Sequence, residues 1–343
     1  MPIIETKQLT KQFRLPVKSA GLAGAVKHLF RPRFRELLAV DCVDIAIDEG
    51  ESVGYVGPNG AGKSTTVKML TGILVPTSGS VRVRGLDPNR QREANARNIG
   101  VVFGQRTQLW WDLPLQESLR LLGDIYDVPE PVFKRNFEEF VELLELAPFL
   151  TTPARQLSLG QRMRGDLAAS LMHSPGIIFL DEPTIGLDVA VKERIRQFVK
   201  RTNRERGATI LLTSHDLGDI EDTCERLIMI DKGRIVYDGP LAEIKLRFGM
   251  KRVIHFMLHE SNDGVAERAR RLLPELSIGA VTKLDAYNLE VEFSPADLSA
   301  SEVIGRLLPE LPVNDLRLEE PEIETIIRAL YEGRLRFDEE RKP

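Results

Sequence analysis

The chain has 343 residues, a length that predicts about two domains. Its 47 lysines and arginines stand against 51 aspartates and glutamates, and the resulting formal net charge of −4 does not indicate a nucleic-acid binder, so we expect no nucleic-acid partner. The hydrophobic content of 42% and the charged content of 29% are typical of an ordinary globular chain.

The cysteines and the N-terminus indicate the compartment. Cys42 and Cys224 form no C-x-x-C pair, which argues against a zinc site and a disulfide framework and favours a reducing cytosol. The start, MPIIE, lacks the basic residues and apolar core of a signal peptide, and no apolar stretch reaches the roughly 18 residues that span a bilayer. We therefore expect a cytoplasmic protein that works at a membrane, if it does so, through a partner.

The N-terminal segment contains an unusual basic insertion. Residues 2–13 predict a strand and a turn, and the insertion follows at about residues 14–36. Between Arg14 and Arg35 it carries six lysines and arginines, no acidic residue, and an apolar set at helical spacing. Two interpretations stay open: a solvated excursion on the surface, or a basic amphipathic segment that touches anionic lipid or a membrane partner.

A phosphate-binding loop follows a strand pattern over residues 52–56. The sequence GPNGAGKST at 57–65 fits the pattern G-x-x-x-x-G-K-[ST], and a helical pattern follows over 66–70. Glycines let backbone amides turn toward phosphates, and the start of a helix favours an anion. Lys63 supplies a charge for the β- and γ-phosphates, while the Ser64 hydroxyl can ligate Mg²⁺. The segment predicts a nucleoside triphosphate site formed by Gly57, Asn59, Gly60, Ala61, Gly62, Lys63, Ser64 and Thr65.

The middle of the chain predicts helices inserted into an α/β core. Strand patterns over 81–85 and 98–103 are followed by Gly104 and Gln105, after which apolar residues recur at helical spacing. A further helix is predicted to begin at the cap Ser158 and to end near His173. We expect a helical subdomain at about residues 106–172.

Two buried strand patterns come next, and each ends in polar residues. The strand over 176–180 is followed by Asp181 and Glu182, and the strand over 209–213 leads to His215. Open α/β sheets bind ligands at the carboxyl ends of their strands. Asp181 is suited to holding Mg²⁺ through its water shell, and Glu182 is suited to polarising an attacking water.

Beyond Gly249 the pattern changes. Strands and helices are predicted in the order β-α-β-β-α-β, which is that of a ferredoxin-like unit, and a last helix is predicted over 321–331. We expect a cassette domain at residues 1–248, a small α+β domain at 249–335 and a frayed tail at 336–343.

Five motifs in order resemble the ATP-binding cassette of ABC transporters: GPNGAGKST at 57–65, Gln105, LSLGQ at 157–161, IIFLDEPT at 177–184, and His215. The resemblance covers about residues 2–248 and is strongest to the single-cassette exporter branch that serves drugs, ions or polysaccharides. It implies a P-loop ABC ATPase fold that binds ATP and Mg²⁺. It also implies that Gln105 reaches the metal and the attacking water, that Glu182 is the general base, and that His215 reaches the γ-phosphate.

The resemblance further implies a dimer. In the family, the signature residues Ser158, Gly160 and Gln161 bind the γ-phosphate held by the other subunit, and the loop that carries Asp188 couples the two sites. One phosphate loop and one signature per chain then require a head-to-tail pair, which we expect to be a homodimer. Leu159 departs from the glycine usual in the family, which leaves the backbone geometry of the signature in question.

For three aromatic residues, a binding role and a role in core packing both stay open. Phe13 matches the position at which the family stacks a ring on adenine, but the insertion after it stretches the spacing, so core packing stays open. Trp110 and Trp111 lie in the region that lines the groove for a permease helix, and a core role for one of them stays open.

The function that the resemblance implies is energy coupling. ATP binding closes the dimer, hydrolysis reopens it, and a separate integral membrane permease, which holds the protein peripherally at the cytoplasmic face, transduces the motion. The alternative is a soluble cassette ATPase of DNA repair or translation, whose usual coiled coils, zinc cysteines or second cassette are not visible in this sequence. A metabolic P-loop kinase would leave LSLGQ and His215 without a role.

Overall fold

The computed structural model describes residues 2–16, 34–104, 106–247, 252–260, 264–276, 280–294, 297–319 and 323–331. Gln105, most of the basic insertion and the tail therefore lie outside the described residues. The contacts divide the chain into two compact units, Met1–Leu241 and Ala242–Pro343. The boundary that we predict after residue 248 stays a proposal, and helix α9 (Leu241–Arg247) begins at the last residue of the first unit.

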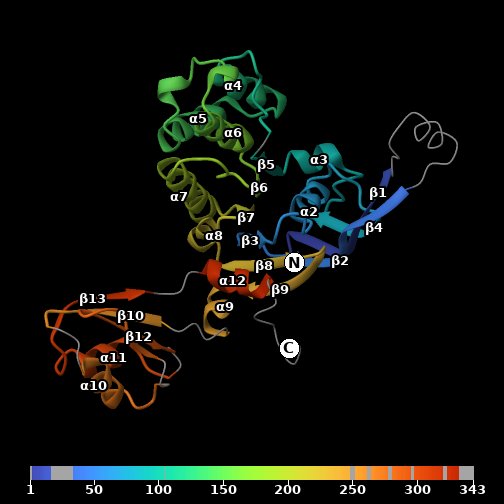
Figure 1. Ribbon diagram of the computed structural model, residues 1–343. Helices are drawn as coiled ribbons and strands as arrows, with labels where there is room; N and C mark the ends of the chain where they lie inside the picture. The colour runs from blue at the N-terminus through green and yellow to red at the C-terminus, as the bar shows by residue number, and fades with distance from the viewer. Residues whose placement is uncertain are drawn as a thin grey trace, which may run out of the picture. The chain divides into compact units, whose positions relative to one another are not determined.

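A six-stranded sheet forms the centre of the first unit (Figure 1). Its order is β5 (Ile99–Phe103), β6 (Ile177–Asp181), β7 (Thr209–Thr213), β3 (Ser52–Val56), β8 (Arg226–Asp231) and β9 (Arg234–Pro240). The first five strands are parallel and β9 is antiparallel to β8. Every residue of β3, β6 and β7 is buried, as their continuous apolar runs predict for strands covered on both faces.

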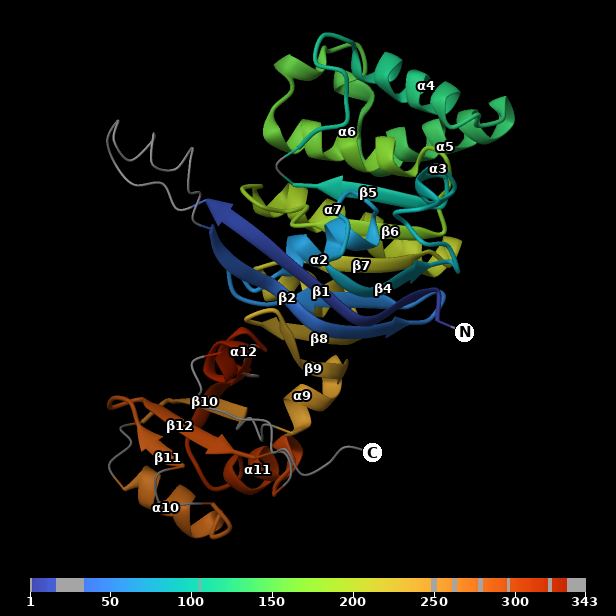
Figure 2. The same ribbon diagram turned by 90° about the vertical axis from the view of Figure 1, so that its right-hand side faces the viewer.

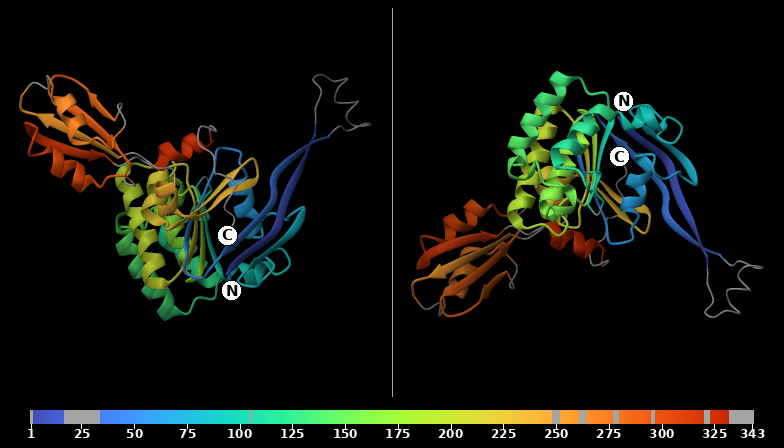
Figure 3. Two further views of the ribbon diagram at one scale, coloured as in Figure 1. Left: turned by 90° about the horizontal axis from the view of Figure 1, so that it is seen from below. Right: turned by 90° about the horizontal axis from the view of Figure 1, so that it is seen from above.

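A second, antiparallel sheet joins β2 (Phe34–Ile47), β1 (Ile4–Pro16) and β4 (Ser78–Val83) in that order. Strand β1 continues beyond the predicted end at Phe13 because its pairing with β2 continues, with Phe13 opposite Leu37 and Pro16 opposite Phe34. The two strands therefore form a long hairpin that projects from the rest of the unit (Figures 2 and 3). The ends of the basic insertion, residues 14–16 and 34–36, belong to this hairpin.

Helices cover the sheets of the first unit. Helix α2 (Lys63–Leu70) contacts β2 and β4 of one sheet and β6 of the other. The predicted helical insertion contains α4 (Leu115–Ile125), α5 (Glu130–Leu143) and α6 (Leu159–Leu171), which gather beyond the β5 edge of the sheet (Figure 2). The described residues of this unit also form α3 (Arg92–Ala96), α7 (Val189–Arg206) and α8 (Leu217–Thr223). The α/β fold class with an inserted helical part is confirmed.

The second unit has a four-stranded antiparallel sheet in the order β11-β12-β10-β13. Its elements are β10 (Arg252–Leu258), α10 (Val265–Leu272), β11 (Val281–Lys283), β12 (Asn288–Phe293), α11 (Ala300–Leu307), β13 (Val313–Glu319) and α12 (Ile323–Tyr331). The first six elements follow the predicted β-α-β-β-α-β order. Phe256 of β10 shares a core with Val265 of α10 and Val303 of α11, so both helices cover one face of this sheet.

Among the helices of the described residues, none combines the length and apolar character that crossing a membrane requires.

We predict that a chain ending at residue 249 folds and binds ATP. Among the described residues, the buried core of the second unit shares none with the core that surrounds β3 and α2. The motifs between Gly57 and His215 all precede the cut. The dissociation constant for a fluorescent ATP analogue should stay within about threefold of that of the full chain, which corresponds to less than about 1 kcal/mol. An insoluble product, or one that binds the analogue no better than a Lys63→Ala control of the same length, would place the boundary elsewhere.

Candidate nucleotide-binding site

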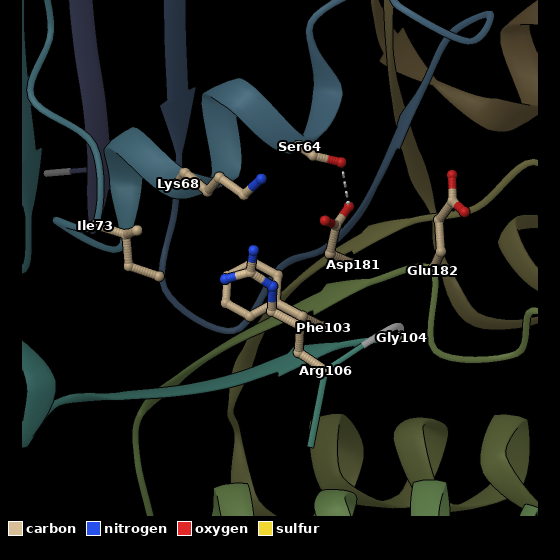
Figure 4. Close-up of a pocket in the computed structure, with 8 residues that line it drawn as sticks. All are labelled: Ser64, Lys68, Ile73, Phe103, Gly104, Arg106, Asp181 and Glu182. Atoms are coloured by element: carbon tan, nitrogen blue, oxygen red, sulfur yellow. Dashed lines mark hydrogen bonds between the residues drawn. The ribbon is translucent and has the colours of Figure 1, made fainter. Parts of the chain in front are cut away.

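The site lies where parallel strands of the first unit end. Because β3, β6 and β7 are neighbours and run in one direction, the segments that follow them meet at one edge of the sheet. A pocket of about 360 Å³ opens there (Figure 4). It is lined by Ser64, Lys68, Ile73, Phe103, Gly104, Arg106, Asp181 and Glu182. Three of the predicted site residues, Ser64, Asp181 and Glu182, are therefore brought together.

The phosphate loop connects β3 to α2. Gly62 caps the helix with a φ of +113°, and a Cβ there would lie 2.4 Å from the carbonyl oxygen of Ala39, so glycine is required. Among the described residues, no side chain caps the start of α2 through a hydrogen bond. The first amides of a helix are the groups that bind an anion there. Asn59 and Gly60 are exposed at the tip of the loop, whereas Ala61 is buried.

Lys63 turns back over the loop. Its Nζ donates to the carbonyl oxygens of Gly57 at 2.6 Å and Pro58 at 3.2 Å. Burial lowers the pKa of Lys63, and the nearby carboxylates of Glu182 and Asp181 oppose that shift. A partly desolvated ammonium group beside uncapped amides favours a multiply charged anion. Thr65 follows in the first turn of the helix and is half-buried.

Asp181 joins three elements. Its Oδ1 accepts a hydrogen bond from Ser64 Oγ of α2 at 3.1 Å and one from Thr213 Oγ1 of β7 at 2.7 Å. The carboxylate is nearly buried at the end of β6, with 9% of the residue exposed. A carboxylate beside a hydroxyl group supplies the oxygen ligands that Mg²⁺ prefers, so these residues fit that ion.

Glu182 is held in an unusual backbone conformation. Its φ is +55°, a value that a residue other than glycine adopts rarely. The Glu182 amide donates to both the carbonyl oxygen (3.0 Å) and the hydroxyl group (3.1 Å) of Thr213, which maintains this conformation. Its Oε2 lies 3.8 Å from Nδ1 of His215, whose side chain is 54% exposed. Glu182 and His215, predicted from separate motifs, therefore lie beside each other.

A buried carboxylate that the sequence analysis missed supports the loop of His215. Asp219 is 1% exposed and accepts hydrogen bonds from Ser214 Oγ at 3.0 Å, from Arg196 Nε at 2.7 Å and from the hydroxyl group of Thr184. It thus connects the segments after β6 and β7 to helix α7. Acidic residues at the start of a helix are usually exposed, so the sequence carried no signal for this role.

The signature residues form a helix start of their own. Ser158 caps α6 in a capping box with Gln161: the Gln161 amide donates to Ser158 Oγ at 3.2 Å, and the Ser158 amide donates to Gln161 Oε1 at 2.9 Å. Gly160 lies close to Val191 of α7, and Leu159 is 45% exposed. None of the described residues that line the pocket comes from this stretch.

The other described residues that the sequence predicts for the site do not belong to the pocket lining. Asp188 caps α7 by accepting a hydrogen bond from the Val191 amide at 2.9 Å. Phe13 is half-buried on β1 with Lys11 Nζ 5.3 Å from its ring centroid, and Gln105 lies outside the described residues. Trp110 and Trp111 are 36% and 52% exposed.

Comparison with known proteins agrees with this arrangement. Residues 40–185 match the family model described as ABC transporter. The chain is 33% identical over 215 residues to the ABC transporter ATP-binding protein NatA of Bacillus subtilis (strain 168). These aligned residues are 63% of this chain and 87% of NatA. It is 28% identical over 299 residues to the linearmycin resistance ATP-binding protein LnrL of the same strain, and this alignment covers 86% of this chain and 94% of LnrL.

A solved structure resembles the first unit. It is a dimeric ATP-binding cassette in a post-hydrolysis state bound to ADP and Pi, with 28% identity and a TM-score of 0.57, and the match covers 69% of this chain and 98% of the cassette. The motifs, the geometry of the pocket and these relatives agree: the chain belongs to the family of ABC transporter ATP-binding proteins and is an ATPase of that family.

Proposed function

We propose that the chain is the ATP-hydrolysing subunit of an ABC transporter and powers a separately encoded membrane permease. The observation that carries this proposal is the convergence of Ser64, Asp181 and Glu182 on one pocket beside an uncapped helix start. Phosphoryl transfer to water requires charge placement around the phosphates and a group that orients the water, and these residues supply both.

The main residues predicted for the site have the following proposed roles. Lys63 and the amides of the loop bind the phosphates, while Ser64 and Asp181 hold Mg²⁺, which neutralises charge on the phosphates when bound. Glu182 accepts the proton of the attacking water, and His215, whose ring lies 3.8 Å from the Glu182 carboxylate, contacts the γ-phosphate. Gln105 contacts the metal and the water. Phe13 stacks on adenine.

The second half of each site comes from another chain. The uncapped start of α2 and the capped start of α6 are separate features of one chain, and no signature residue is among the described residues that line the pocket. The dimer of the related cassette, bound to ADP and Pi, supports a pair of chains. In this pair Ser158, Gly160 and Gln161 of one chain complete the site that Lys63 of the other begins, and Asp188 couples the two sites.

An exporter is the transporter type that we favour. The relative LnrL is named for resistance to linearmycin, a role that export of a toxic compound fulfils. The exposed rings of Trp110 and Trp111 offer large apolar contacts of the kind enriched at protein interfaces, and we propose that they contact the permease. The permease holds the subunit at the cytoplasmic face of the membrane.

The test measures whether ATP hydrolysis by the chain is stimulated by the permease. The chain is co-expressed with the multi-span proteins of adjacent reading frames and reconstituted in vesicles. We expect Mg²⁺-dependent ATPase activity that the vesicles stimulate, and at least about 10²-fold less activity for Lys63→Ala, the usual scale for a lost phosphate-stabilising charge. Activity stimulated by DNA ends or ribosomes, and unchanged by the vesicles, would instead support the repair or translation alternative.

A further inference from the structure

The ring of His215 takes its place from the backbone around it. Its side chain is 54% exposed, and Nδ1 lies 3.8 Å from Oε2 of Glu182, which is longer than a hydrogen bond. An exposed ring without a direct bond to its neighbour follows the chain that carries it. The residues on either side, Ser214 and Asp216, therefore decide where the ring lies.

Ser214 closes the turn that carries His215. It is 1% exposed, and its Oγ accepts a hydrogen bond from the Asp216 amide at 3.0 Å. The same hydroxyl group donates to Oδ2 of Asp219 on α8 at 3.0 Å. Because a hydroxyl group has one proton to donate, its bond to Asp219 leaves the lone pairs of Ser214 Oγ for the Asp216 amide. Asp219 thus sets the direction of both hydrogen bonds.

The same carboxylate oxygen also holds the segment after Glu182. Thr184 follows Glu182 by two positions and is 3% exposed, and its hydroxyl group donates to Oδ2 of Asp219. One buried oxygen therefore accepts a proton from the residue before His215 and from a residue just after Glu182. The two side chains that meet at the pocket edge are carried by segments that share this acceptor.

Arg196 of α7 keeps the carboxylate itself in place. Its Nε donates to Oδ1 of Asp219 at 2.7 Å, and its Nη1 lies 3.1 Å from Oδ2 of Asp222 on the same helix as Asp219. The Arg196 side chain is 19% exposed and that of Asp219 is 1% exposed. A buried carboxylate with an ion-pair partner and two hydroxyl donors is fully bonded, so Oδ2 is a fixed point to which both hydroxyl groups are tied.

We propose that Asp219 is a positioning residue for hydrolysis: through the hydroxyl groups of Ser214 and Thr184 it sets the distance between the His215 ring and the Glu182 carboxylate. Asp219 is buried and does not touch the nucleotide in this scheme. The inference rests on the proposed function, since it requires that His215 contributes to turnover. The competing explanation is that these bonds only stabilise the junction between β7 and α8.

The test removes the two hydroxyl groups and keeps the carboxylate, because loss of Asp219 would leave Arg196 without its buried partner. In the full chain, Ser214→Ala and Thr184→Val should each lower kcat about 10-fold, within the range of couplings between contacting residues. The KM for ATP should stay within about twofold, because the phosphate loop is unchanged. Thr184→Ser keeps the hydroxyl group and should stay within about threefold of wild type.

Two matched controls separate positioning from stability. Ser170→Ala and Thr202→Val remove buried hydroxyl groups that donate to carbonyl oxygens within α6 and α7. They make the same chemical changes as the test variants at positions away from the pocket lining, so they should leave kcat unchanged whatever they do to the Tm. Equal losses of kcat in the controls and the test variants would support the structural explanation and overturn the proposal.

The decisive arm places Ser214→Ala in a His215→Ala background, with single-turnover assays at excess chain to measure slow variants. If Ser214 acts through His215, the second change should lower the rate less than about twofold further. Losses that multiply would overturn the proposal, as would a Thr184→Ser variant as slow as Thr184→Val. If Ser214→Ala does not fold, Thr184→Val takes its place in the same background. A His215→Ala variant with wild-type turnover would overturn this proposal together with the role of His215, whereas a wild-type chain without ATPase activity would refute the proposed function itself.

Discussion

We expect Glu182→Gln to lower ATP turnover by about 10²–10⁴-fold, the usual scale for removal of an acid–base group, while ATP binding is retained. The amide has nearly the shape of the carboxylate but does not accept a proton. The Glu182 amide remains bonded to Thr213, so the backbone conformation at φ +55° should be preserved. Asp181, Ser64 and Lys63, which we propose to bind ATP and Mg²⁺, are also untouched.

Two measurements check this expectation. Steady-state phosphate release gives the turnover, and gel filtration with ATP should show the variant accumulating as an ATP-bound dimer. Glu142→Gln, which removes an equal charge from an exposed position on α5, is the matched control and should behave as wild type. ATPase activity of Glu182→Gln within threefold of wild type would remove Glu182 from the proposed role of general base.

The sequence predicted the elements whose patterns are local. The apolar runs of β3, β6 and β7 end where polar residues begin, and parallel pairing then brings Ser64, Asp181 and Glu182 to one edge. The capping box at Ser158 is another local signal, because the cap and Gln161 are three positions apart. The order of strands and helices along the second unit was predicted from the same kind of pattern.

Contacts between distant residues carried no such signal. Asp166 bonds to Thr107 across 59 positions and Asp219 bonds to Thr184 across 35, and a buried aspartate looks the same in sequence as an exposed one. The strand β1 was predicted too short because its last residues, Arg14 to Pro16, include a proline, which is rare in strands. These residues owe their extended conformation to pairing with β2. Tertiary pairing overrode local preference there.

We expect Ser158→Arg to abolish the closed dimer and to lower ATP turnover by at least about 10²-fold, the scale for loss of a preorganised anion donor, while the monomer still binds ATP. Arginine adds bulk and charge at the start of α6, where the proposed partner presents its γ-phosphate. The described residues that line the pocket of the same chain include no signature residue, so the affinity of that pocket for ATP should change little. Gel filtration with ATP and a binding titration separate the two effects.

Loss of the helix cap is a second consequence of this change, and the chain offers a matched control. Ser299 caps α11 of the second unit in a capping box with Glu302, as Ser158 does with Gln161 in the first. Ser299→Arg therefore costs a similar cap, about 1 kcal/mol, at a helix remote in sequence from every motif. It should keep both the ATP-bound dimer and turnover, and a loss equal to that of Ser158→Arg would mean that general destabilisation explains both.

Mixing two inactive chains tests directly whether the sites are shared. Lys63→Ala lacks the charge that we propose to bind the phosphates, and Ser158→Arg blocks the proposed complementary surface. In their heterodimer one composite site carries both changes and the other carries neither, so turnover should return to at most about half of the wild-type value if each site works alone. A mixed dimer of wild type with Lys63→Ala is the control, because it contains one intact site and is active only if the sites act independently. Activity in that control together with none in the first mixture, while heterodimers form in both, would contradict a site completed by Ser158 of the partner subunit.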